Sequence, residues 1–296
     1  MSQEPQDEYL TLTDLDEQVW EQLALVAGCP GTCFLDLSGI KRVTPAGAIG
    51  LLLFAKGRMT KSSQRLTTRV ETPREQSSEF ELLKQIDLIH LLRVHSQFQF
   101  VDRLRGGYDQ APPVPKLSAY TKTLIQGSKD REGVAEVMRR ALQKSYPAES
   151  DKLLSLFSEL INNIEHHTTC NGHPSFHCVQ TRANRDCLEL AFGDLGPGFM
   201  TTLARNPQNP HYLTDTDALR AAMVEGRSSM SHELEYRGGG LRRALAIVSE
   251  LGGTYRVVSN DGLAQLNGSM DATYSTLSGN LKATMVWARL PLRAQA

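Results

Sequence analysis

Hydrophobic spacing in the first third of the chain switches between helical and strand-like periods. Apolar residues return every three or four positions over 15–26, 47–59 and 78–92, which predicts three helices. Short apolar or alternating runs at 32–37 and 66–71 predict strands. Because strands and helices alternate along this part of the chain, we expect a small α/β layer here.

The rest of the chain continues the mixture of helices and strands. We expect helices at 131–144, 149–167, 216–224 and 241–251, and strands at 175–180, 187–193, 254–259 and 283–290. Between the two parts lies the run RGGYDQAPPVPK, whose glycines and prolines fit neither a helix nor a central strand. The pattern therefore predicts an α/β (α+β) protein with a domain at 1–104, a linker at 105–116 and a second domain at 117–296.

Composition narrows the classes of function. The 296 residues are 40% hydrophobic, and the formal net charge of -1 gives no general attraction to nucleic acid or to an anionic membrane. The five cysteines are an odd number scattered along the chain, which argues against a disulfide framework. The N-terminus has no apolar signal segment, and the apolar run at 46–55 is too short to span a bilayer. We therefore expect a soluble cytoplasmic protein with neither nucleic acid nor membrane as a partner.

One predicted helix carries three polar residues at helical spacing. In LLSLFSELINNIEHH the apolar residues form one stripe. Glu159, Asn163 and His167 follow one another at intervals of four residues and share a strip beside it. On its own, such a strip is typical of a solvated helix face.

Two glycine-rich segments follow this helix. In AFGDLGPGF an apolar strand ends at Asp194, which can accept a hydrogen bond from a ligand amine, and Gly196 and Gly198 let the backbone approach a ligand closely. In RGGGLRR the glycines run directly into a predicted helix, whose free N–H groups and dipole favour an anion. Two arginines in the first turn of that helix oppose the dipole unless an anion such as a triphosphate is bound.

In this order, the segments resemble the ATP-binding domain of the GHKL family, which includes sensor histidine kinases, type II topoisomerases, mismatch-repair ATPases and anti-sigma-factor serine kinases. ELINN matches the E-x-x-x-N box, DLGPG the D-x-G-x-G box and GGGL the second glycine box, while Thr284 matches a late threonine before the final strand. The resemblance covers residues 117–292. The segment 199–237 would be the ATP lid of the family, and we expect Gly226 and Ser228 to anchor it.

The resemblance implies a Mg-ATP site. Glu159 would be the catalytic general base, Asn163 the Mg²⁺ ligand, and Asp194 the partner of the adenine amino group. Phosphoryl transfer needs positioning and charge stabilisation, and a hard Mg²⁺ ion suits an amide oxygen. The further cofactor-binding residues that the resemblance implies are His167, Gly196, Gly198, Gly238, Gly239, Gly240, Leu241 and Thr284.

The first part of the chain carries a second resemblance, over residues 8–103. The strand, loop and apolar helix in CFLDLSGIKRVTPAGAIGLLLFAKGRM are similar to the STAS domain of anti-sigma-factor antagonists. Those proteins carry D-S-S-G in the loop, with the first serine as phosphoacceptor, and the residues aligned here are Thr44, Pro45, Ala46 and Gly47. Because proline has no hydroxyl, we expect no phosphorylation at that position or on Thr44. The domain also looks short of strands.

Together the two resemblances imply an ATP-binding signalling regulator in which two partner-switching proteins are fused. We expect a Mg-ATP-dependent serine/threonine protein kinase or ATPase that acts on a regulatory protein of the sigma-factor or STAS-antagonist class, with a homodimer as a possible assembly. The alternatives are a catalytically weak ATP-gated protein-binding module and the ATPase part of a histidine-kinase-like system. The last is disfavoured because 105–130 is too short and too rich in proline for a dimerisation helix pair.

A cluster of histidine and cysteine at 166–178, HHTTCNGHPSFHC, is a weaker signal. These residue types are the usual zinc ligands, but the spacing fits no finger pattern. His177 and Cys178 would also point to opposite faces of a strand. We therefore expect a loop here rather than a zinc site.

Overall fold

The structure is a computed structural model of the 296-residue chain. It describes residues 8–59, 68–71, 99–100, 142–168, 175–181, 187–229, 239–268 and 271–292, together with the single positions 83, 88, 136, 139 and 140. The predicted linker at 105–116 and most of the helices predicted at 78–92 and 131–144 lie outside these residues.

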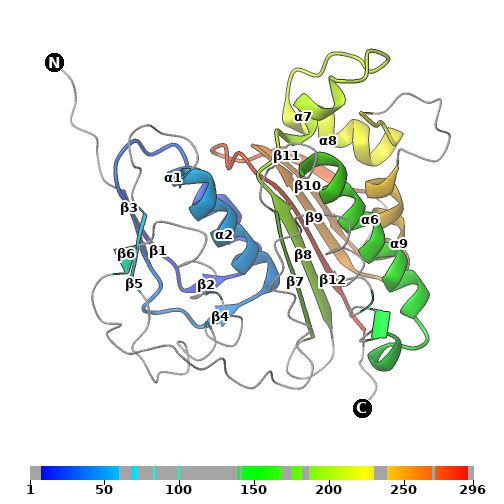
Figure 1. Ribbon diagram of the computed structural model, residues 1–296, viewed down its shortest axis with the longest axis horizontal. Helices are drawn as coiled ribbons and strands as arrows, with labels where there is room; N and C mark the ends of the chain where they lie inside the picture. The colour runs from blue at the N-terminus through cyan, green and yellow to red at the C-terminus, as the bar shows by residue number, and fades with distance from the viewer. Residues whose placement is uncertain are drawn as a thin grey trace.

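The described elements stack in the order parallel sheet, helices, antiparallel sheet, helices (Figure 1). The first part of the chain supplies β1 (Glu8–Thr11), β2 (Asp14–Leu15), α1 (Val19–Val26), β3 (Cys33–Asp36), β4 (Arg42–Val43), α2 (Pro45–Met59), β5 (Thr68–Glu71) and β6 (Gln99–Phe100). Within the described residues, the strand order of the parallel sheet is β1-β3-β5-β6, and β2 pairs with β4 separately. Helices α1 and α2 lie between this sheet and the antiparallel one (Figure 1).

The second part of the chain forms the antiparallel sheet and its outer helices. The strands are β7 (Ser175–Thr181), β8 (Leu188–Asp194), β9 (Thr254–Ser259), β10 (Gly262–Asn267), β11 (Thr273–Thr276) and β12 (Thr284–Leu290). The helices are α6 (Ser150–Thr168), α7 (Gly198–Leu203), α8 (Asp215–Arg220), the π-helical turn η2 (Ala221–Glu225) and α9 (Gly240–Glu250). Among the described strands the order is β11-β10-β9-β12-β8-β7, and α6 and α9 pack against each other on the face away from α2 (Figure 1).

Both faces of the antiparallel sheet are buried along β8 and β12. Side chains alternate between the two faces of a strand. On β12, Val286 and Ala288 join the core beneath α6 and α9, whereas Met285 and Trp287 join the core that contains α1 and α2. A sheet covered on both faces needs apolar residues on both, which explains the nearly continuous apolar runs of β8 and β12.

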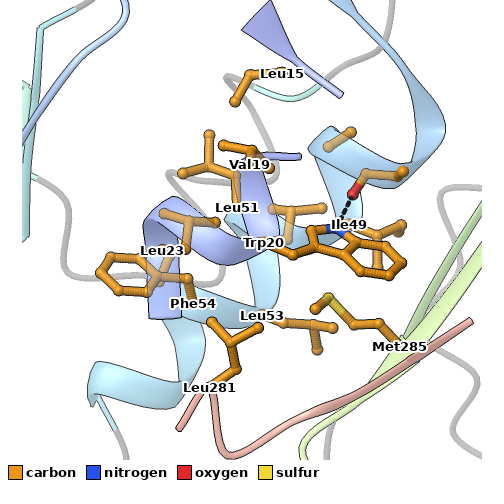
Figure 2. Packing of buried hydrophobic residues seen from close by; sticks show 14 of the residues in the cluster. Leu15, Val19, Trp20, Leu23, Ile49, Leu51, Leu53, Phe54, Leu281 and Met285 are labelled. Atoms are coloured by element: carbon orange, nitrogen blue, oxygen red, sulfur yellow. Dashed lines mark hydrogen bonds between the residues drawn. The ribbon is translucent and has the colours of Figure 1, made fainter. Parts of the chain in front are cut away.

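Helix α2 is apolar around most of its circumference, as a helix buried on several sides must be. Two of its glycines allow close contact with neighbouring elements. A Cβ on Gly47 would lie 2.1 Å from the carbonyl carbon and oxygen of Leu15, and one on Gly50 would lie 2.7 Å from the Trp20 ring. Trp20 in turn donates a 2.9 Å hydrogen bond from Nε1 to the Ala46 carbonyl (Figure 2). This side of α2 therefore faces α1 and β2.

Replacing Gly47 by alanine is expected to lower the free energy of unfolding by about 3 kcal/mol or more, because the added methyl group overlaps backbone atoms that cannot rotate away. Gly39→Ala is the matched control, since a Cβ there meets nothing within 4 Å. We expect the control to change stability by less than about 0.5 kcal/mol. Denaturant unfolding of both variants measures the difference, and equal stabilities would contradict the close approach of α2 to β2.

The predicted mixture of helices and strands is confirmed, with differences at particular elements. The helix predicted at 15–26 begins at Val19, because Leu15 pairs with Val43 in a short parallel ladder. The first part was predicted to be short of strands, but the structure adds β1, which pairs with β3. The sequence of β1, EYLT, lacks clear alternation, so the pattern did not reveal it. Hydrophobic spacing does not reveal β10, β11 or the short helix α7. Strand β11 is largely exposed at the sheet edge, so its polar sequence has no core-facing pattern.

None of the helices in the described part of the chain combines the length and the hydropathy that a bilayer crossing requires.

Candidate functional site

A pocket lies where α6 and the start of α9 meet one end of the antiparallel sheet. Its lining outlines about 450 Å³ of space, a volume that includes open solvent. Its walls are mostly apolar, with a few polar groups among them. The lining residues are Leu160, Asn163, Phe192, Gly193, Asp194, Gly196, Pro197, Gly198, Phe199, Thr202, Leu241, Thr284 and Val286.

Asp194 is a buried carboxyl group in this pocket, at the end of β8. The residue is 4% exposed, and its Oδ1 accepts a 2.7 Å hydrogen bond from the Gly196 N–H. Burial raises the pKa of Asp194 to about 7, although the Gly196 hydrogen bond opposes the shift. The β8–β12 register places Thr284 directly beside Asp194. A carboxylate that is this poorly solvated gains most from a ligand that donates a hydrogen bond to it.

The glycine turn after β8 is held by a network of polar side chains. Gly198 has a φ of +81°, a left-handed conformation that favours glycine, and begins α7. The Phe199 N–H donates a 2.8 Å hydrogen bond to Ser259 Oγ, which donates at 3.2 Å to Asp215 Oδ1. Asn260 Nδ2 donates to both carboxylate oxygens of Asp215 at 3.1 Å. The turn, α8 and the β9–β10 hairpin are therefore tied together.

Glu159 and Asn163 of α6 face the first turn of α9. A Cβ on Gly240 would lie 2.8 Å from Glu159 Oε2 and 3.3 Å from Asn163 Oδ1, so the two helices touch here. Asn163 Nδ2 is buried, and it has no hydrogen-bond partner among the described residues. Arg243 donates from Nη1 to Glu159 Oε1, and their side chains are 66% and 17% exposed respectively. The arginine that opposes the dipole of α9 is thus partnered by a carboxylate of α6.

The structure brings most of the predicted site residues to this pocket. Those that line it are Asn163, Asp194, Gly196, Gly198, Leu241 and Thr284. Glu159, Gly239 and Gly240 adjoin it at the contact between α6 and α9. His167 lies on α6, but its side chain is outside the described residues, as is Gly238. The roles assigned to these residues from the resemblance stay predictions.

Several residues of the site are not found by sequence reasoning. Phe192 and Val286 line the pocket because they share a sheet face with Asp194 and Thr284, and strand alternation was a signal that could have found them. The network residues Asp215, Ser259 and Asn260 are separated from the glycine turn in sequence. The signal for the last two was the Asn-Asp-Gly run at 260–262, which is typical of a hairpin turn.

The predicted lid is described as far as Ser229. Gly226 ends η2, and a Cβ on it would lie 3.8 Å from the Gly239 Cα. The Ser228 carbonyl accepts hydrogen bonds from Asn206 Nδ2 at 3.2 Å and Asn209 Nδ2 at 2.9 Å. The end of the segment is therefore held near α9 and α7, which is compatible with the predicted anchor.

A metal site formed only by protein side chains is not seen in the described residues, which contain no group of three or more His, Cys, Asp or Glu placed to hold an ion. A loop was predicted for the histidine and cysteine cluster at 166–178, and residues 169–174 of it lie outside the described part of the chain. Asn163 can supply one amide oxygen to a hard cation whose other ligands are phosphate and water, the usual arrangement for Mg²⁺.

No protein family model matches this chain, and no curated protein matches it either.

Proposed function

We propose that this chain binds Mg-ATP in the pocket between α6, α9 and the antiparallel sheet, and that it is a GHKL-type ATPase or serine/threonine protein kinase. The observation that carries the proposal is the convergence of separate motifs on one apolar pocket. Asn163 comes from α6, Asp194 from the end of β8 and Leu241 from the glycine-led start of α9. Thr284, from the last strand, stands beside Asp194 in the sheet.

The apolar part of the pocket suits a purine ring. Leu160, Phe192 and Val286 offer apolar walls, and Asp194 is a buried acceptor among them. Since Oδ1 of Asp194 is engaged by Gly196, the other carboxylate oxygen can receive the adenine 6-amino group. Guanine carries an oxygen at that position and would place an acceptor against the carboxylate, so the site should prefer ATP to GTP.

The other end of the site suits phosphates. The N–H groups in the first turn of α9 have no partner within the helix, as at any helix start, and they lie at the positive end of the helix dipole. Glu159 lies beside this turn, where it can orient a water molecule or a partner's hydroxyl as general base. When bound, Mg²⁺ would neutralise phosphate charge, and Asn163 would provide its protein oxygen.

Replacing Arg243 by alanine is expected to weaken ATP binding about tenfold and to leave adenosine binding unchanged, since the lost guanidinium lies next to the proposed phosphate site. Arg242→Ala is the matched control, because the neighbouring arginine is exposed and makes no ion pair with Glu159 among the described residues. Calorimetric titration with both ligands measures the effect. An equal loss for adenosine would contradict a phosphate contact.

A binding module that uses ATP as a gate is the second candidate, and the STAS-like part supports it. Thr44 is 5% exposed, and its hydroxyl donates to the Leu15 carbonyl and accepts from the Gly47 N–H. Pro45, which aligns with the phosphoacceptor of antagonists, is buried as the first residue of α2. Neither Thr44 nor Pro45 therefore offers an exposed hydroxyl at the position of the antagonists' phosphoacceptor. The acceptor in this proposal belongs to a separate regulatory protein of the sigma-factor or STAS-antagonist class.

The melting temperature of the chain with different nucleotides tests the proposal. With ATP and Mg²⁺ at about 100 times Kd, binding adds about 2.7 kcal/mol to the stability of the native state, so we expect a rise of about 5 °C. GTP at the same concentration should give a smaller rise. If neither ATP nor ADP changes the melting temperature, both the enzyme and the ATP-gated module are excluded.

A further inference from the structure

Helix α2 packs against the reverse side of the strands that build the pocket. A Cβ on Gly193, a pocket residue, would lie 2.4 Å from Leu53 Cδ1 and 2.9 Å from Ile49 Cγ2. The two side chains come from successive turns of α2, so they contact β8 on the face of the sheet opposite the pocket. Figure 2 shows Ile49 and Leu53 in one cluster with Met285 of β12, the residue next to Thr284. One strand thickness thus separates the first part of the chain from the pocket.

Leu195 extends this contact into the turn that follows β8. It is 9% exposed and belongs to the core around α1 and α2, not to the core beneath α6 and α9. A Cβ on Gly57 would lie 3.4 Å from Leu195 Cδ2. Gly57 is one further turn along α2 from Leu53, so Ile49, Leu53 and Gly57 form one face of the helix toward β8.

The two neighbours of Leu195 in the chain both line the pocket. Asp194 and Gly196 are joined by the 2.7 Å hydrogen bond on the pocket side, while the Leu195 side chain is buried on the opposite side. The backbone of this turn is therefore fixed from two directions. Loss of the Leu195 contact would free the backbone that aims the Asp194 carboxyl.

We propose that Leu195 is a positioning residue through which α2 holds Asp194 in place to recognise the 6-amino group of adenine. This inference rests on the proposed ATP-binding function. It gives the first part of the chain a role in nucleotide recognition: its docking on the sheet shapes the adenine end of the pocket. A merely structural role for Leu195 would lower stability without changing which nucleotide is preferred.

The test compares ATP with purine riboside 5′-triphosphate, which lacks the 6-amino group, by calorimetric titration of the full chain. In Leu195→Ala we expect ATP affinity to fall about tenfold and affinity for the analogue to change less than about twofold, since only the hydrogen bond to Asp194 is weakened. Leu51→Ala is the matched control, because Leu51 is a fully buried leucine of the same core, near Val19 (Figure 2). It should lose stability but keep the wild-type preference for ATP.

Leu195→Met, which fills similar volume, should restore the preference, and the milder Leu195→Val provides a folded variant if the alanine form does not fold. If the wild type prefers ATP and both Leu195→Ala and Leu195→Val keep that preference unchanged, the positioning role is wrong while the proposed function stands. If the wild type binds both nucleotides equally, Asp194 does not read the amino group, and the proposed adenine recognition fails together with this inference.

Discussion

Replacing Asp194 by asparagine is expected to make the free protein more stable at pH 8, by about 2–4 kcal/mol, and to abolish most of its affinity for ATP. Burial raises the pKa of Asp194 from 3.8 to about 7 in the folded state. Between these two values the folded chain holds a proton that the unfolded chain releases. The stability of the wild type should therefore fall as pH rises from about 4 to 7, and the asparagine variant should lack this fall.

The loss of affinity follows from the geometry of the same group. In Asp194→Asn the amide oxygen is needed by the Gly196 N–H, so the amide nitrogen faces the pocket. A donor then opposes the amino group of adenine, and we expect ATP to bind about 100-fold more weakly. In the wild type, the affinity for ATP should fall as the pH drops below 7, because ATP needs the charged carboxylate. The loss should approach about tenfold per pH unit.

Denaturant unfolding at pH 5 and pH 8, together with ATP titration at both values, measures these effects. Asp217→Asn is a suitable control, since that exposed carboxylate accepts a hydrogen bond from the Thr214 hydroxyl at the start of α8 and lies outside the lining of the pocket. A variant at Asp194 that is less stable than the wild type at pH 8 would contradict the cost of burying this charge. Unchanged ATP affinity would contradict its contact with adenine.

Replacing Glu159 by alanine is expected to lower the rate of phosphate release or transfer by a factor of about 100 to 10,000, the usual contribution of a general base. ATP affinity should change less than about threefold, because the carboxylate acts on the attacking group rather than on the bound nucleotide. The side chain lies beside Gly240 at the start of α9, where the terminal phosphate would sit. Single-turnover phosphate release, together with ATP titration, separates the two quantities.

Two further variants make this prediction sharper. Glu159→Gln removes the base and keeps a group that fills the same space, so it should be as slow as the alanine form. Arg243→Ala removes the ion pair but keeps the carboxylate of Glu159. We therefore expect any activity that survives in this variant to depend still on Glu159. If all Glu159 variants release phosphate at the wild-type rate, Glu159 is not the base. A wild type that binds ATP without turnover would favour the ATP-gated binding module.

The parts of the site that the sequence predicted are those encoded by local spacing. Glu159 and Asn163 share a helix face because they are four residues apart. Asp194 ends an apolar strand, and this position does not depend on which elements pack against the strand. The network around Asp215 was not predicted, because its members meet only through the β9–β10 hairpin and α8. These contacts depend on tertiary register, which a periodic pattern does not contain.

The stacking of the two parts of the chain was also not predicted from the sequence. Leu195 appears there as an ordinary apolar residue within a glycine turn, and Gly193 as one more flexible position. Their structural role comes from their contact with α2, which lies more than 130 residues earlier in the chain. The sequence predicted α2 only as a helix, and its apolar residues do not identify the sheet as one of the surfaces that cover it.

The titration of the Asp194 carboxyl carbon, followed by NMR in the free and ATP-bound chain, tests the central claim most directly. In the free chain the pKa of Asp194 should lie at about 7, raised by burial. With ATP and Mg²⁺ bound, the adenine amino group favours the charged form, so the pKa should fall well below that value. A pKa of Asp194 that is unchanged or raised by saturating ATP would contradict an adenine site at this pocket.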